Sequence, residues 1–263
     1  LPEIRKDDGT EIAPHLRLRE KFGLYAGIRP VKAYPNSPQR LKDPNSKKIN
    51  LVILRECTEG LFYTASVHNR NPVANNDEVH DVMKITRETS KKLHNFAFKL
   101  AQKRKLKGSV GKVTCVDKAN VFKSQALFRK VFNEVKTGFK DIKAETSYVD
   151  AMALNLIRNP WEYDVLVMEN IFGDILSDMG GGLVGGMGMA SCAEIGDKHG
   201  LFDDDGAKVI RRELKHSSFK RSFELGELLN GEKVKASFKD GLLSIEIPKI
   251  EPEKPKRTSV KIS

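Results

Sequence analysis

The sequence predicts an α/β fold over most of its length, followed by a short antiparallel β segment. Two observations carry this prediction. Short apolar runs of strand length alternate with longer segments whose apolar residues recur at helical spacing, as in α/β proteins. Beyond residue 203 this alternation stops, and short strand-like runs follow one another. At 263 residues, the chain is long enough for one or two domains with a sizeable core.

The α/β part is predicted to span residues 1–202. Apolar runs predict strands at 49–54, 111–116 and 163–168. Apolar residues at helical spacing predict helices at 86–104, 121–135, 148–158 and from Ile171 onward. The glycines at 180–182 and 185–186 indicate a turn or a close packing contact.

A polar break at 203–206 places the domain boundary between residues 202 and 203. A β segment is predicted over 203–248, with strands at 219–225, 234–238 and 242–247. Asp240 and Gly241 lie between the last two strands and predict a hairpin. Residues 249–263 are rich in Pro, Lys and Glu, which predicts a flexible tail.

Composition narrows the class of protein. The net charge is +11, but the basic residues are spread along the chain without interleaved aromatic residues, so nucleic-acid binding is not expected. No apolar run approaches the roughly 18 residues that span a bilayer, and the first residues lack the apolar segment of a signal peptide. Three widely spaced cysteines favour a reducing compartment. We therefore expect a cytoplasmic protein without a membrane partner.

Two carboxylates follow the apolar run 164–168. Asp174 and Asp178 are four residues apart, and on a helix this spacing places them on one face. Such a pair at the start of a helix could hold a divalent cation. An ordinary solvated acidic pair is the alternative, and geometry alone favours it.

The sequence around these carboxylates strengthens the case for a metal site. The segment Asn170–Asp178, preceded by Tyr148–Met152, resembles the metal- and substrate-binding signature of the β-decarboxylating dehydrogenases. That family contains the isopropylmalate, isocitrate, homoisocitrate, tartrate and D-malate dehydrogenases. Further motifs follow in family order at 18–20, 24–30, 55–60 and 116–120. The resemblance implies an incomplete isopropylmalate-dehydrogenase-like fold over residues 1–202.

The resemblance also implies roles for individual residues. Arg19, Arg29 and Arg55 match arginines that clamp the substrate carboxylates, for which a guanidinium group offers paired donors and a fixed charge. Lys118 matches a lysine that takes part in proton transfer, and Asn120 a residue near the nicotinamide. The ligands of Mg²⁺ or Mn²⁺ match Asp150, Asp174 and Asp178. In the family, the equivalents of Lys118 and Asp150 reach the site from a second subunit, which implies a homodimer with a shared active site.

Departures from the family pattern concern the acid group and the cofactor. Where the family has a tyrosine that protonates the enolate, this chain has Phe62, with Tyr63 beside it as a possible substitute. In a strand these neighbours would face opposite sides. The family's opening strand and glycine-containing loop have no counterpart, and after Phe202 acidic residues replace the adenosine-binding loop. Substrate choice depends on the helix before Arg19, where His15 matches neither the isopropylmalate nor the isocitrate enzymes.

Residues 203–263 resemble the C-terminal half of the α-crystallin domain of small heat-shock proteins. The resemblance rests on 218–225 and 236–243, and on Val260 and Ile262, which match a tail motif that docks on a neighbouring domain. The first expectation is therefore an NAD(P)- and Mg²⁺- or Mn²⁺-dependent oxidoreductase that decarboxylates a 2-hydroxy diacid, with poor turnover because cofactor elements are missing. A 3-isopropylmalate-like substrate is preferred over isocitrate, tartrate or D-malate. The alternatives are a chaperone-like assembly module or a non-functional hybrid.

Overall fold

A computed structural model describes residues 4–5, 11–35, 40–186, 191–203, 235–239 and 242–246. The chain divides into two compact units, Leu1–His216 and Ser217–Ser263. Within the described part of the chain, no helix is both long and apolar enough to cross a membrane.

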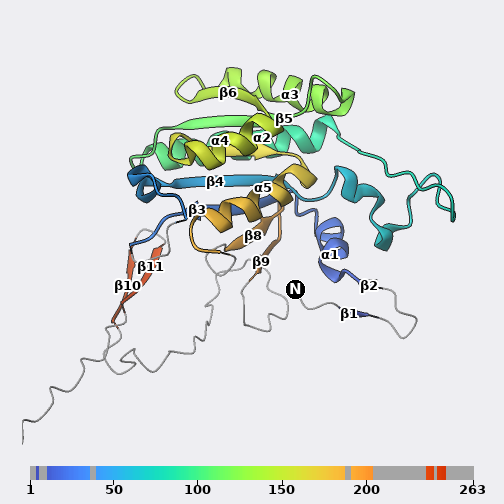
Figure 1. Cartoon of the computed structure of the whole chain (residues 1–263), viewed down its shortest axis with the longest axis horizontal. Coiled ribbons are helices and arrows are strands. Elements are labelled where there is room, and N and C mark those ends of the chain that lie inside the picture. The colour runs from blue at the N-terminus through green and yellow to red at the C-terminus, as the bar shows by residue number, and fades with distance from the viewer. Residues whose placement is uncertain are drawn as a thin grey trace, which may run out of the picture. The chain divides into compact units, whose positions relative to one another are not determined.

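The first unit is built on a seven-stranded sheet with the order β6-β5-β7-β4-β3-β8-β9 (Figure 1). Strands β6, β5, β7 and β4 are parallel to one another, and β3, β8 and β9 extend the sheet in antiparallel pairs. The strands are β3 (Ala26–Lys32), β4 (Asn50–Glu56), β5 (Lys112–Asp117), β6 (Lys143–Tyr148), β7 (Val165–Met168), β8 (Cys192–Ile195) and β9 (Gly200–Asp203). Two short strands of two residues each, β1 (Ile4–Arg5) and β2 (Glu11–Ile12), form a separate antiparallel ribbon.

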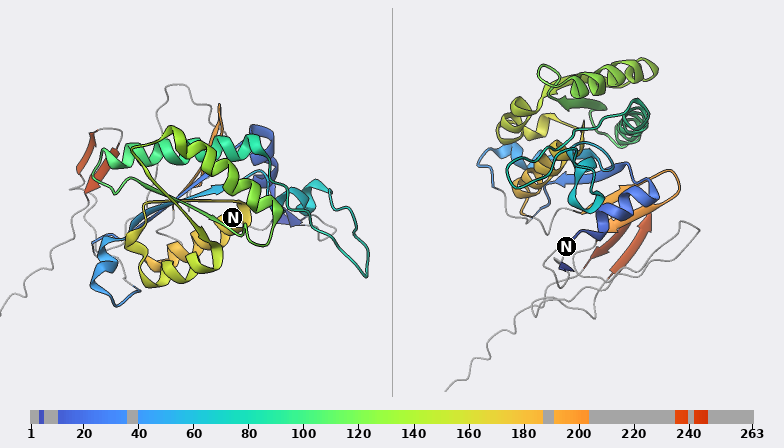
Figure 2. Two further views of the ribbon diagram at one scale, coloured as in Figure 1. Left: turned by 90° about the horizontal axis from the view of Figure 1, so that it is seen from above. Right: turned by 90° about the vertical axis from the view of Figure 1, so that its right-hand side faces the viewer.

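Helices cover both faces of this sheet (Figure 2). On one face lie α2 (Arg87–Lys105) and α3 (Lys123–Val135), and on the other α4 (Val149–Arg158) and α5 (Asn170–Leu183). The remaining helix, α1 (Pro14–Phe22), precedes β3. Short 3-10 helices are η1 (Pro44–Lys48), η2 (Leu61–Thr64), η3 (Ser66–His68), η4 (Lys136–Gly138) and η5 (Pro160–Glu162).

The central strands are apolar on both sides because each face of the sheet is covered. In β4, Val52 and Leu54 pack toward α2 and α3, whereas Leu51 and Ile53 pack toward α4 and α5. Strand β7 alternates in the same way. This arrangement confirms the predicted α/β fold class and explains why the central strands read as continuous apolar runs.

The predicted elements agree closely with the observed ones at the centre of the sheet, and less well at its edges. Tyr148, expected to begin a helix, is instead the last residue of β6. Both alternatives predicted for the glycines occur. Residues 180–182 lie in α5, where a Cβ atom on Gly180 would come within 2.7 Å of Val31 Cγ2, whereas Gly185 lies in the turn after the helix with a φ of 132°.

The second unit contains one described hairpin. Its strands β10 (Lys235–Lys239) and β11 (Leu242–Glu246) pair in antiparallel register, with Phe238 opposite Leu243. The predicted strand 219–225, the turn residues 240–241 and the tail 249–263 lie outside the described residues.

Candidate functional site

The residues predicted to be functional gather where the parallel strands end. In the sheet register, Arg55 of β4 lies opposite Met168 of β7, and Met168 lies opposite Val116 of β5. These three strands therefore end side by side. The segments that follow them carry Lys118 after β5 and Asp174 in α5. The carboxyl edge of a parallel sheet is where α/β proteins place their ligands.

Arg19 is held by a carboxylate that no sequence motif singles out. Arg19 lies on α1 and is 6% exposed, and its Nε donates to both carboxylate oxygens of Glu194 on β8 at 2.9 Å. Nη2 of Arg19 also donates to Glu194 Oε1. Glu194 is 4% exposed, so this is a buried, charge-assisted pair with several hydrogen bonds.

Arg55 joins the same region to the start of α5. Its Nε donates to Asn170 Oδ1 at 2.9 Å, and its Nη1 donates to Asp174. Asn170 is fully buried and donates its own amide to the carbonyl of Glu59 at 2.9 Å, which fixes the amide orientation. The ring centroid of Phe62 lies 4.9 Å from Arg55 Cζ. Arg55 is thus oriented from three sides while Asp174 stays 42% exposed at its side chain.

The three predicted arginines form one electrostatic cluster. Nη2 of Arg29 is 3.7 Å from Glu194 Oε1. Burial lowers the pKa of Arg55, and the nearby charges of Arg19 and Arg29 lower it further while Asp174 opposes them. We call Arg19, Arg29, Arg55 and Glu194 the arginine cluster.

Two glycines make room for this cluster. Gly27 of β3 lies opposite both Arg55 and Glu194, so these three residues share one face of the sheet. A Cβ atom on Gly27 would approach Cys57 Sγ to 2.7 Å. A Cβ atom on Gly173 would come within 2.6 Å of Arg55 Cβ and Cγ. The lack of a side chain at Gly173 therefore allows α5 to approach Arg55 closely, and the lack of one at Gly27 leaves room for Cys57 beside the cluster.

Lys118 and Asp150 form a second, separate pair. Lys118 Nζ lies 2.6 Å from Asp150 Oδ1, and the Asp150 side chain is 67% exposed. The hydrogen bond from Lys118 lowers the pKa of Asp150. Behind Lys118, the fully buried Asp117 accepts two hydrogen bonds of 2.7 Å from Arg129 and one of 2.9 Å from the amide of Ala119. This network fixes the turn that carries Lys118.

The remaining predicted ligands are accessible. Asp178 is exposed one helical turn beyond Asp174, and Asn120 is exposed in the turn after β5. Among the described residues of this single chain, no three His, Cys, Asp or Glu side chains come close enough to hold a metal ion. The structure therefore does not gather Asp150, Asp174 and Asp178 into one metal site within one copy of the chain.

Phe62 and Tyr63 lie in the 3-10 helix η2, so the expectation that they are neighbours in a strand is wrong. The two rings nevertheless contact different groups. Whereas Phe62 packs against Arg55, the Tyr63 ring lies 4.8 Å from Arg70 Cζ and 4.7 Å from Lys84 Nζ. Phe62 is thus the ring that adjoins the arginine cluster.

His15 lies on α1, four residues before Arg19, and is half-buried. Burial lowers its pKa, and the positive charge of Arg19 lowers it further. His15 therefore adjoins the arginine cluster as a predominantly neutral side chain at pH 7.

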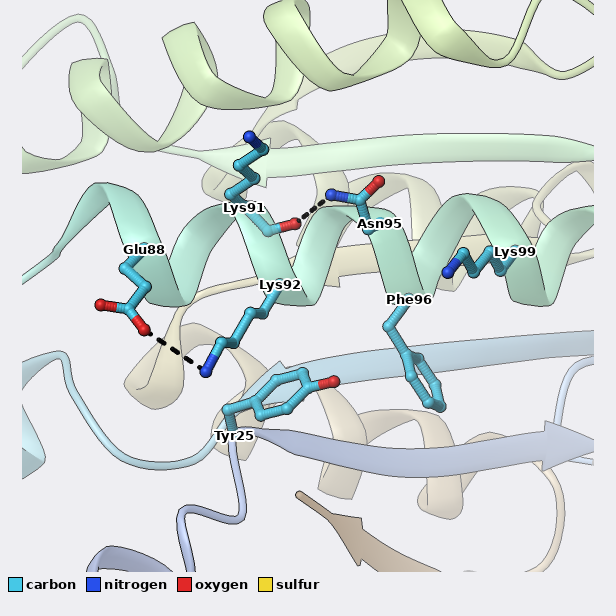
Figure 3. Close-up of a pocket in the computed structure, with 7 residues that line it drawn as sticks. All are labelled: Tyr25, Glu88, Lys91, Lys92, Asn95, Phe96 and Lys99. Atoms are coloured by element: carbon cyan, nitrogen blue, oxygen red, sulfur yellow. Dashed lines mark hydrogen bonds and ion pairs between the residues drawn. The ribbon is translucent and has the colours of Figure 1, made fainter. Parts of the chain in front are cut away.

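A separate pocket of about 440 Å³ lies between α2 and the residue preceding β3 (Figure 3). Its walls include Tyr25, Phe96 and three lysines, and Lys92 is paired with Glu88. None of the predicted site residues lines it. The arginine cluster, and not this pocket, is the candidate site.

Comparison with known proteins explains this arrangement. The family model for isocitrate/isopropylmalate dehydrogenase matches residues 4–206. The chain belongs to this dehydrogenase family. The Hsp20/alpha crystallin model matches residues 195–263 and overlaps the first match at 195–206. Both resemblances predicted from the sequence are confirmed.

Individual relatives agree with the family assignment. The 3-isopropylmalate/3-methylmalate dehydrogenase of Methanocaldococcus jannaschii is 44% identical over 189 residues, which cover 72% of this chain and 54% of that protein. The homoisocitrate dehydrogenase of the same organism is 39% identical over 197 residues, or 73% and 54% of the two chains. The isocitrate dehydrogenase of Methylococcus capsulatus has a similar structure, with a TM-score of 0.65, 32% identity and coverage of 76% and 56%. The chain thus spans about half the length of these dehydrogenases.

Sequence reasoning missed several members of the site of this dehydrogenase-family chain. Glu194 lies 175 residues from Arg19 in the sequence, and only the pairing of β3 with β8 brings it to the cluster. The sequence also does not reveal that Asn170 orients Arg55, or that Arg129 pairs with Asp117. Polar residues at or just after the end of an apolar strand are a signal that could have singled out Asp117 and Asn170.

Proposed function

We propose that this chain binds a 2-hydroxy diacid and a divalent cation at the carboxyl edge of its sheet, for oxidative decarboxylation with NAD⁺ or NADP⁺. The observation that carries the proposal is the convergence of Arg19, Arg29 and Arg55 beside Asp174. Buried guanidinium groups favour planar anions with paired acceptor oxygens, and a diacid supplies two of these.

Asp174 and Asp178 are the proposed metal ligands within one chain. Both follow the buried strand β7 and lie one turn apart on α5, with Asp174 partly exposed and Asp178 exposed. Hard cations such as Mg²⁺ and Mn²⁺ prefer oxygen ligands of this type. When bound, the cation would supply Lewis acidity toward the 2-hydroxyl and the adjacent carboxylate. The donor set fits in part, because one chain provides two close ligands and a third must come from elsewhere.

A second copy of the chain is the proposed source of that third ligand. The family resemblance implies that Lys118 and Asp150 reach the active site of the other subunit. In this structure the two residues form an ion pair with each other. The outward side of α4 carries Leu154 and Ile157, each 53% exposed, and α5 carries Ile175, which is 61% exposed. Exposed apolar residues on two neighbouring helices favour burial against another subunit. We therefore propose a homodimer with shared active sites.

Proton transfer and cofactor binding are proposed on the same basis. Lys118 would exchange a proton with the 2-hydroxyl, because an amine beside a carboxylate can shuttle protons. Asn120 would adjoin the nicotinamide. Tyr63 is retained as the proposed acid, although Phe62 is the ring beside Arg55. Because acidic residues follow Phe202 where an adenosine-binding loop is expected, we expect binding to be retained and NAD(P)H production to be slow.

Thermal unfolding of the purified chain tests the proposal. Mn²⁺ would be combined in turn with 3-isopropylmalate, isocitrate, tartrate and D-malate, because a ligand bound only by the native state raises the unfolding temperature. A metal-dependent upward shift with one diacid is expected. The variant Arg55→Gln, which removes one of the three guanidinium charges of the cluster and its contact with Asp174, should abolish the shift.

The outcome distinguishes the proposal from a hybrid without function. If none of the four acids raises the unfolding temperature with or without Mn²⁺, the dehydrogenase site is not formed and the proposal fails. An ordinary steady-state rate of NAD(P)H production would contradict the expected slow turnover.

A second candidate function rests on the second unit. The Hsp20 match at 195–263 and the β10–β11 hairpin favour a chaperone-like assembly module. This candidate predicts large assemblies whose mass decreases when residues 259–263, which include Val260 and Ile262, are deleted. A uniform dimer that is unchanged by the deletion, measured by light scattering after size-exclusion chromatography, would contradict it.

A further inference from the structure

Glu194 is a resident carboxylate inside the proposed anion site. Its two oxygens accept hydrogen bonds from Arg19, and one of them lies 3.7 Å from Nη2 of Arg29. It is 4% exposed, so solvent contributes little to screening its charge. Glu194 therefore occupies donors that would otherwise face a bound anion.

The position of Glu194 is fixed by the backbone and does not depend on a flexible loop. It lies on β8, where it pairs with Gly27 of β3, and Gly27 in turn pairs with Arg55 of β4. Across paired strands, opposed residues point to the same face of the sheet. Arg55 and Glu194 thus flank a glycine that has no side chain to separate them.

The charge of the cluster follows from these contacts. Arg19, Arg29 and Arg55 carry three positive charges, and Glu194 offsets one of them. Asp174 also pairs with Arg55, but its side chain is 42% exposed and it is a proposed ligand of the cation, whose charge compensates it. Two positive charges are left to face the substrate.

We propose that Glu194 is a specificity-determining residue that adapts the arginine cluster to dianions, so that 2-hydroxy diacids are accepted and tricarboxylates are disfavoured. This inference rests on the proposed function. A third substrate carboxylate would bring a negative charge toward a buried carboxylate of the same sign, and like charges in a poorly screened site repel strongly.

The remaining donors agree with a two-carboxylate ligand. Nε of Arg29 is buried and has no hydrogen-bond partner among the described residues. Buried polar atoms normally have a partner, so this donor is consistent with a site completed by an anion. With Arg19 engaged by Glu194, Arg29 and Arg55 remain as one guanidinium for each carboxylate of a diacid.

Isothermal titration calorimetry of the full chain with Mn²⁺ tests this inference. The probes are D-malate, 3-isopropylmalate and isocitrate, which share the malate skeleton; 3-isopropylmalate carries an apolar substituent where isocitrate carries a third carboxylate. The variants are Glu194→Gln, which keeps the size and removes the charge, and Glu88→Gln. The latter removes the same charge from a side chain on α2 that is 82% exposed.

We expect the wild-type chain to bind a diacid about tenfold or more tightly than isocitrate. Glu194→Gln should reduce this ratio by about tenfold, and Glu88→Gln should leave it at the wild-type value. An unchanged ratio in a folded Glu194→Gln variant that still binds the diacid overturns the role of Glu194 and leaves the proposed function intact.

Two other results are also decisive. If Glu194→Gln does not fold, the ratio of the diacid and isocitrate affinities of the wild-type chain tests the inference. Isocitrate binding that equals or exceeds diacid binding would overturn it. If neither the wild-type chain nor the Glu88→Gln variant binds any of the three acids, the proposed function fails, and the inference that rests on it fails with it.

Discussion

Two buried aspartates of this protein are paired with arginines. Asp164 is 2% exposed, receives a hydrogen bond from Arg104 and accepts a second from the amide of Gly111 at 2.9 Å. Asp117 is held by Arg129 in the same manner. Pairing of this kind is required because an isolated buried charge costs several kcal/mol. The arginine cluster follows this rule at Arg19 but leaves one donor of Arg29 without a partner among the described residues.

His94 is a buried titratable group without a hydrogen-bond partner among the described residues, and it makes stability depend on pH. The ring is fully buried, packs 4.4 Å from the Phe128 ring centroid, and has no hydrogen-bond partner in the described structure. Burial lowers its pKa from 6.5 to about 3. Between these values the unfolded chain binds a proton that the folded chain does not, so this contribution to stability is lost as the pH falls below 6.5.

The variant His94→Leu should remove this dependence. Between pH 7.5 and pH 5, the wild-type unit should lose about 2 kcal/mol of unfolding free energy through His94, because each pKa unit corresponds to about 1.4 kcal/mol. The variant should lose correspondingly less over the same interval. Urea unfolding at the two pH values measures the difference. Equal losses in both proteins would show that the proton uptake occurs elsewhere.

At the same scale, the sequence predicts the reactive groups better than it predicts their contacts. Arg19, Arg29 and Arg55 could be singled out by resemblance, and the structure brings them together. Glu194 could not be assigned a partner, because its contact with Arg19 depends on which strand pairs with β3. The pairing of strands far apart in the sequence cannot be predicted from the residues near Glu194 alone.

Among the elements, α5 depends on glycine at the point where it meets Arg55. We expect Gly173→Ala to displace Arg55, because the added Cβ would lie 2.6 Å from two of its side-chain carbons. Overpacking of this kind lowers the free energy of unfolding by about 1–3 kcal/mol. The affinity for the diacid with Mn²⁺ should also fall about tenfold. Both quantities are measured by urea unfolding and calorimetry.

The matched control is Gly182→Ala in the same helix. A Cβ atom there would meet nothing within 4 Å, and alanine favours a helix by up to about 1 kcal/mol over glycine. The control should therefore be as stable as the wild type or more so, with unchanged diacid affinity. If the two variants behave alike, close approach of Gly173 to Arg55 is not what shapes the site.

Prediction of elements from the sequence succeeded where burial is complete on both faces. Strands β4, β5 and β7 are predicted correctly because they lie inside the sheet and each contains a buried run of mostly apolar residues. Strand β3 was missed, since it contains Gly27, Arg29 and Pro30. Pro30 is accommodated because β8 pairs only with Ala26–Ile28, so the proline lies beyond that ladder. Edge strand β6 is largely exposed, and its polar residues gave no strand signal.

At the scale of the whole molecule, helix α4 carries apolar residues on two sides in the described part of the chain. Helix α4 buries Met152 and Leu156 in the core, yet it also exposes Leu154 and Ile157. A helix that is apolar all round is normally buried on all sides. Together with the exposed Ile175 of α5, this surface is the physical argument for a second copy of the chain. That copy would also supply the proposed third metal ligand.

We therefore expect Leu154→Lys combined with Ile175→Lys to convert the proposed dimer to a monomer, because the interface would then bury lysines without counter-charges. Sedimentation velocity measures the change, and the Mn²⁺-dependent stabilisation by the diacid should disappear with the partner's Asp150. The control Leu106→Lys changes a residue that is 89% exposed at the end of α2, and it should remain a dimer. A wild-type monomer that still binds metal and diacid would show that one chain completes the site alone, and would overturn the shared-site arrangement.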